Sequence, residues 1–157
     1  MQRAITPIME KILKPFFEED SSYREIPIAY LTYITTGSTP ETITITGYTG
    51  PVPMGKVSIP AQINGIPVTA IADGASTTGV FRDKGLTGVT IPTNVTSIGN
   101  YAFAENRLTS ITFMGSGVAS IPTNFTNPSG NDLASVYIGA GTYTRPNADS
   151  PNWAGPY

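Results

Sequence analysis

The chain has 157 residues, enough for one ordinary domain or for a small domain with an appendage. Charged residues make up 13% of it and the net charge is −2, which excludes electrostatic attraction to nucleic acid or to an acidic membrane surface. Histidine and cysteine are absent, which excludes His-based triads, Cys or His nucleophiles, zinc sites and disulfides. We expect neither a cofactor nor a metal, and no membrane insertion, because no stretch is long enough to span a bilayer.

Charge divides the chain into two parts. Residues 1–41 hold half of all charged side chains, whereas residues 42–157 have a net charge of zero. This change in composition predicts two units, an N-terminal docking or capping segment at 1–41 and a second domain at 42–157.

The first unit begins with a predicted amphipathic helix. Thr6-Pro7 is typical of an N-cap followed by proline in the first turn, and Pro15 would kink or end the helix. The apolar residues that recur at helical spacing, which we take as the docking surface, are Ile5, Ile8, Met9, Ile12, Phe16 and Phe17.

A strand with apolar side chains on both faces is predicted at residues 26–34. One helix and one strand cannot bury Phe16, Phe17 and Leu31 between them. This first unit therefore packs as a cap on residues 42–157 or docks onto a partner chain, and the sequence leaves both alternatives open.

The second unit contains internal repeats. Residues 86–91, 108–113 and 133–138 share the pattern L-x-x-V/I-x-I/F and follow one another at steps of 22 and 25 residues. Each hexamer is preceded by a related segment, at 68–71, 95–98 and 118–121. An aromatic residue follows each segment, at Phe103 and Phe125 and, later than the regular spacing, at Phe81. Residues 57–59 add a partial leading coil.

Such repeats predict a solenoid in which each coil contributes a short strand to a parallel sheet, because one coil cannot bury its own apolar face. The hexamer's apolar residues then point inward and the aromatic residue fills the opposite wall. The first coil, 68–89, has an insertion at 76–79 and lacks the regular aromatic position. We expect a mainly β chain, a short leucine-rich-repeat-type solenoid with a small N-terminal α/β segment, closed by a lid containing Tyr143, Pro146, Trp153 and Tyr157.

The run Val95-Thr-Ser-Ile-Gly-Asn-Tyr-Ala-Phe103, followed by Leu108-Thr-Ser-Ile-Thr-Phe113, resembles the BspA-type leucine-rich repeat of bacterial surface proteins. Residues 45–50 and 57–71 resemble the usual beginning of such arrays, and 141–144 with Trp153 resembles a common exit. The resemblance covers about residues 42–155. It implies a non-catalytic interaction module that is often adhesive.

The candidate binding face consists of the side chains between the inward positions of the three hexamers. They form an uncharged, hydroxyl-rich strip, and the alternative is that threonine simply suits an exposed strand. The residues of this strip are Thr87, Thr90, Thr109, Thr112, Ser135 and Tyr137.

Asp83 and Glu105 share one repeat phase and should lie on adjacent coils. Paired carboxylates serve glycoside chemistry or calcium binding, but the neighbouring Arg82, Lys84 and Arg107 favour a solvated ridge of cross-coil ion pairs. The aromatic residues of the C-terminal lid suit stacking on sugars, although we expect them to cover the last coil.

Two non-enzymatic functions follow. In one, residues 1–41 dock the protein onto a larger assembly, such as a virion fibre or decoration protein, as a homo-oligomer or with other protein partners. This fits a first segment without a signal-peptide run, because Glu10, Lys11 and Lys14 interrupt it. In the other, the chain is a secreted bacterial adhesin or carbohydrate-binding module with a glycan ligand. The compartment stays open between the virion and the extracellular surface.

Overall fold

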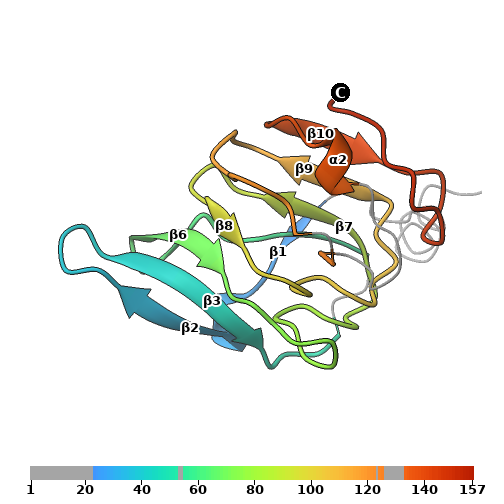
Figure 1. Ribbon diagram of the computed structural model, residues 1–157. Coiled ribbons are helices and arrows are strands. Elements are labelled where there is room, and N and C mark those ends of the chain that lie inside the picture. The colour runs from blue at the N-terminus through green and yellow to red at the C-terminus, as the bar shows by residue number, and fades with distance from the viewer. Residues whose placement is uncertain (1–22, 53–54, 123, 126–132) are drawn as a thin grey trace, which may run out of the picture.

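The computed structural model describes residues 23–52, 55–122, 124–125 and 133–157. The repeats form two sheets, and in each sheet the strands of successive coils lie side by side (Figure 1). Sheet A has the strand order β1-β4-β7-β9-β10, and sheet B has the order β2-β3-β6-β5 with β8 also beside β6. The elements are β1 (Arg24–Glu25), a 3-10 turn (Ile28–Tyr30), β2 (Leu31–Thr36), β3 (Thr42–Tyr48), β4 (Gly55–Ser58), β5 (Gln62–Ile63), β6 (Ile66–Ile71), β7 (Leu86–Ile91), β8 (Ser97–Ile98), β9 (Ser110–Phe113), α2 (Leu133–Val136) and β10 (Gly141–Thr144).

The first two hexamers are the parallel strands β7 and β9, as predicted. Val89 lies beside Ile111 in the ladder, so the strands are offset by the 22-residue repeat. The partial leading coil supplies β4, whose Val57 lies beside Val89 in parallel register. The preceding segments build sheet B, where Ile71 of β6 lies beside Ile98 of β8. The expected mainly β solenoid is therefore confirmed.

The core is filled by the inward hexamer residues and by a column of aromatic rings. Phe81, Phe103 and Phe125 are fully buried, with ring centroids 5.2 and 5.1 Å apart along the column. The prediction that the first coil lacks the regular aromatic position was wrong, because Phe81 occupies it. The inserted residues 76–79 are accommodated before it in a turn where Ala75 and Thr78 form a bridge.

Two tyrosines extend this column toward the N-terminal end. Tyr48 lies 6.2 Å from Phe81, and Tyr30 lies 6.2 Å from Tyr48 in an edge-on arrangement. Tyr30 is 38% exposed, so the column begins at the surface and becomes buried within two rings. The sequence repeats did not indicate these two positions.

Residues 23–41 pack on the repeats through both sheets. β1 pairs in parallel with β4, and β2 pairs antiparallel with β3. A continuous strand over 26–34 was the wrong prediction: Pro27 has no N–H for a ladder, and the chain turns at Ile28–Tyr30 as it passes from sheet A to sheet B. The helix expected in residues 5–17 lies outside the described residues, and the boundary at residue 41 stays a prediction.

The third hexamer is not a strand, which corrects the sequence prediction. Residues Leu133–Val136 form one helical turn, and Ile138, expected to point inward, is 79% exposed. The reason is that β10 occupies the place beside β9, running antiparallel, with buried Tyr143 opposite Ile111.

The C-terminal segment covers the last coil, as expected. Trp153 is 4% exposed, and Ala154 and Tyr157 pair antiparallel with β10 through Thr144 and Thr142. Among the described residues, none of the helices has the length and apolar character needed to cross a membrane.

Candidate contact face

The outer face of sheet A carries two rows of small polar side chains, which we call the hydroxyl face. These positions alternate with the buried residues of each strand, so they point away from the core. In ladder register, one row is Ser58, Thr90, Thr112 and Thr142, and the other is Lys56, Gly88, Ser110 and Thr144. All of them except buried Gly88 are half-buried, and Lys56 is the one charged member of the rows.

Four of the predicted strip residues lie on or beside this face. Thr90 and Thr112 are neighbours in its first row, and the Thr112 hydroxyl lies 2.9 Å from that of Thr142. Thr87 and Thr109 lie at the beginning of their hexamers, where the Thr109 hydroxyl donates to the Thr87 carbonyl at 3.3 Å. Thr90 and Thr112 are therefore members of the hydroxyl face, whereas Thr87 and Thr109 lie outside its two rows, and the role of all four in binding stays a prediction.

Ser135 and Tyr137 do not join the strip, because the third hexamer turns into α2. The ring of Tyr137 packs 4.8 Å from Phe113 and 5.7 Å from Tyr143. Burial, followed by the nearby Tyr143, raises the pKa of the Tyr137 phenol. The strip is completed instead by Thr142 and Thr144 of β10.

Tyr23 lies across the hydroxyl face from its N-terminal edge. Its hydroxyl is 3.2 Å from the Ser110 hydroxyl on β9, and Lys56 lies over its ring at 5.7 Å from the centroid. Between them is Gly88, where an added Cβ would lie 3.1 Å from the Tyr23 hydroxyl oxygen. Glycine at this position therefore lets the tyrosine cross β7 in close contact, and the segment that ends at residue 22 joins the described fold at this face.

Sequence reasoning missed several members of the face, including Tyr23, Ser58, Ser110 and Thr142. Strict alternation around the buried Val89 and Ile111 would have selected positions 88, 90, 110 and 112. Tyr23 gave no signal, because a contact across 87 positions in sequence follows from the fold alone.

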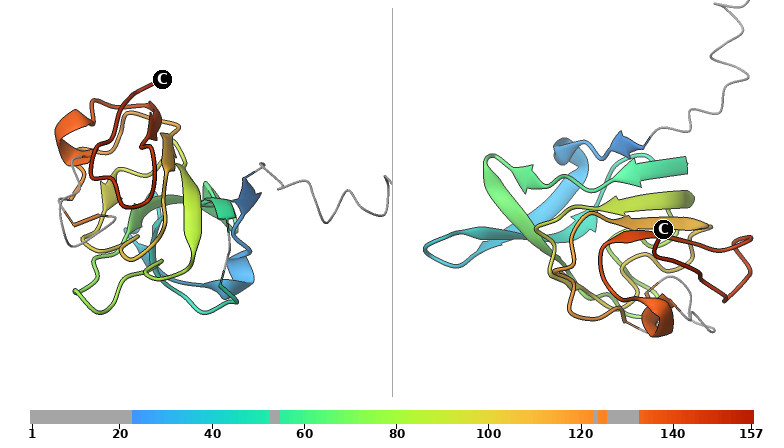
Figure 2. Two further views of the ribbon diagram at one scale, coloured as in Figure 1. Left: turned by 90° about the vertical axis from the view of Figure 1, so that its right-hand side faces the viewer. Right: turned by 90° about the horizontal axis from the view of Figure 1, so that it is seen from above.

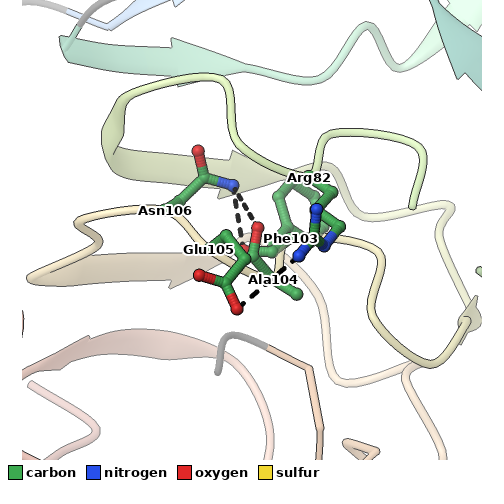
Figure 3. A network of polar contacts seen from close by, with 5 residues as sticks. All are labelled: Arg82, Phe103, Ala104, Glu105 and Asn106. Atoms are coloured by element: carbon green, nitrogen blue, oxygen red, sulfur yellow. Dashed lines mark hydrogen bonds and ion pairs between the residues drawn. The ribbon is translucent and has the colours of Figure 1, made fainter. Parts of the chain in front are cut away.

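The charged ridge on the neighbouring loops contains one of the expected cross-coil ion pairs. Arg82 and Glu105, from adjacent coils, are 3.7 Å apart (Figure 3). Asp83 and Glu105 share a left-handed backbone, with φ of 54° and 59°, which agrees with their predicted common repeat phase. Within the described ranges, no three acidic side chains gather to hold a metal ion.

Asn106 stabilises this loop from inside. Its amide nitrogen donates to the carbonyls of Phe81, Phe103 and Ala104, and its oxygen accepts the N–H groups of Lys84 and Leu86. Figure 3 shows the bonds to Phe103 and Ala104 beside the ion pair. These bonds tie two coils together, so the loops have a structural role.

Two of the three C-terminal aromatic rings are not accessible for sugar stacking. Tyr143 and Trp153 are buried, whereas Tyr157 is 79% exposed. The rings of Tyr143 and Trp153 are therefore packed into the fold, and Tyr157 has the one ring of the three that is accessible for stacking.

Comparison with known proteins found one family model and one solved structure that are similar to part of this chain. Residues 75–143 match the family model described as a BspA type leucine rich repeat region (6 copies). A crystal structure of a T. pallidum leucine-rich repeat protein is similar, with 32% identity over 51% of this chain and a TM-score of 0.42. The matched part covers 34% of that protein. A search of curated proteins gave no match.

Proposed function

We propose, on the premise that residues 75–143 form a BspA-type leucine-rich repeat region, that this protein works by contact as part of a larger assembly. The family is generally non-enzymatic and suggests an interaction or surface role. In the proposal, residues 1–41 attach the chain to the assembly and the hydroxyl face meets a protein partner. In this proposal the assembly is, for example, a virion, and the chain is its fibre or decoration protein.

The observation that carries the proposal is the position of Tyr23 on the hydroxyl face. The amphipathic segment predicted within residues 1–22 is connected to Tyr23, which lies on this face, and the rows of the face hold a single charged side chain, that of Lys56. A flat face of hydroxyl groups on rigid strands provides donors and acceptors without the cost of desolvating charge.

The proposal is tested by photo-cross-linking this chain to its neighbours in the assembly, in the native host. A benzophenone amino acid replaces Thr90 on the hydroxyl face, and a control chain carries it at Ser97 on β8 of sheet B. We expect a discrete cross-linked protein from position 90 and none from position 97. Equal cross-linking from both positions, or none from position 90 while the chain remains in its assembly, would contradict the proposal.

A second candidate function is glycan binding by a secreted adhesin. It is favoured by exposed Tyr157, whose backbone pairs with Thr142 at the end of the hydroxyl face, so an aromatic ring adjoins a row of hydroxyl groups. A glycan panel tests it: binding lost in Tyr157→Ala, with the fold retained, would support this candidate over the first.

A further inference from the structure

β2 is the outermost strand of sheet B. Its inner side pairs with β3 along Leu31–Thr36, and the described residues place no strand on its other side. The backbone N–H and C=O groups along such an edge are a template for pairing with another strand.

The edge lacks two of the features that usually prevent association, charge and proline, although the register of β2 against β3 shifts between Thr32 and Tyr33. Leu31–Thr36 contains no charged residue and no proline, and it is rich in β-branched side chains. The edge of sheet A differs, because β1 has two residues, both charged and exposed. At the other end, the segment that pairs with β10 contains Pro156.

An exposed apolar side chain lies at the middle of this edge. Ile34 is 53% exposed, and Thr32 and Thr36, two positions away on either side, are exposed too. Because side chains alternate along a strand, the three residues share the outer face of sheet B. The turn between β2 and β3 projects beyond the other strands in two directions of view (Figures 1 and 2), which leaves the strand accessible to a second molecule.

We propose that two copies of this chain associate through β2, antiparallel, about a two-fold axis at Ile34. This register places Ile34 opposite its own copy and Thr32 opposite Thr36 of the second copy, so that one apolar pair is flanked by two hydroxyl pairs. The edge is complementary to itself in this register, and no like charges meet. The pairing joins the two B sheets into one continuous sheet.

The occupant is a second copy because the exposed residues on the outer face of the edge, Thr32, Ile34 and Thr36, are symmetric about Ile34 in side-chain type. A strand from another protein is the competing occupant, and it would leave the purified serine variant of Ile12, Phe16 and Phe17 monomeric. The proposal goes beyond the assembly function, because it involves neither residues 1–22 nor the hydroxyl face.

The test is light scattering of the full-length variant in which Ile12, Phe16 and Phe17 are serine, so that the residues assigned to the assembly function do not contribute. The concentration runs between about 1 µM and about 1 mM, where a weak strand-pairing interface becomes occupied. We expect the mass to rise toward twice 16.6 kDa. Ile34→Lys should leave a monomer, whereas Met114→Lys, at a residue that is 59% exposed after β9, should keep the dimer. A monomer at every concentration, or a dimer that survives Ile34→Lys, overturns the proposal.

Cross-linking keeps the register testable even if Ile34→Lys weakens the fold. The chain has no cysteine, so Ile34→Cys introduces one thiol per molecule. Directly opposed residues of an antiparallel pair bring their Cβ atoms close to disulfide distance. We expect rapid oxidation to a covalent dimer for Ile34→Cys and not for Met114→Cys; equal rates overturn the register. Replacement of Ile12, Phe16 and Phe17 by serine should leave this dimer intact, which separates its outcome from that of the assembly function.

Discussion

The side-chain oxygen of Asn106 accepts the backbone N–H of Leu86, 20 residues earlier, at 3.1 Å. The bond joins the loop of one coil to the first strand residue of the preceding coil. With the bond from the Asn106 amide to the Phe81 carbonyl at 2.7 Å, it closes both sides of the loop that leads into β7. The buried Asn106 amide therefore holds the start of β7, the strand that carries Thr90 of the hydroxyl face.

Asn106→Ala should destabilise the fold by about 3 kcal/mol, because several buried backbone groups lose their partners at once. Asn106→Asp should also destabilise, since a carboxylate cannot donate to the Phe81 carbonyl. Urea unfolding followed by circular dichroism measures both. Asn100→Ala, at an exposed asparagine, is the matched control and should cost less than about 1 kcal/mol.

Phe103→Ala should cost about 3–5 kcal/mol, because the ring is fully buried between Phe81 and Phe125. Tyr30→Ala, at the exposed end of the same column, should cost less than half as much. Equal losses of stability in the two variants, measured by thermal unfolding, would show that burial does not increase along the column of rings from Tyr30 to Phe103.

Tyr137→Phe should leave stability unchanged or raise it by up to about 1 kcal/mol. The Tyr137 hydroxyl is buried without a hydrogen-bond partner among the described residues, so its removal costs nothing in bonding. A decrease in the free energy of unfolding, measured by urea unfolding, would mean that the hydroxyl has a hydrogen-bond partner.

Stability of the native chain should fall as the pH rises above about 10. Burial raises the pKa of Tyr48 and of Tyr137 above the ordinary value of 10.0 in each case, so the folded state holds these protons more tightly than the unfolded state. The stabilisation is present below pH 10.0 and is lost as the pH rises through the raised folded pKa. Tyr137→Phe should flatten this alkaline loss, which urea midpoints at pH 8 to 11 would measure.

Arg145→Lys should destabilise the C-terminal cover by about 1–2 kcal/mol. The buried Arg145 guanidinium donates from Nε to the Leu108 carbonyl and lies 4.8 Å from the Trp153 ring. Lysine has a single nitrogen and no planar group to stack. Tryptophan fluorescence during unfolding reports this loss directly, and an unchanged midpoint would argue against the role of Arg145.

The repeat pattern predicted the parallel strands, their offset and most of the core, because each inward residue recurs at a fixed step. Prediction failed where the repeat meets a cap. Leu133–Ile138 has the hexamer pattern, yet β10 takes the neighbouring strand position by antiparallel pairing, and the pattern contains no information on that competition. Tyr23 was missed for the same reason, since its contact with Ser110 depends on how the chain enters the fold.

The most direct test of the central claim, that the first segment carries the protein into an assembly, is the solution mass of the full chain. Light scattering after gel filtration compares it with the variant in which Ile12, Phe16 and Phe17 are serine. We predict a mass above that of a dimer for the full chain, and a folded dimer or monomer for the variant. A full chain no larger than a dimer, or equal masses for both, would contradict the claim.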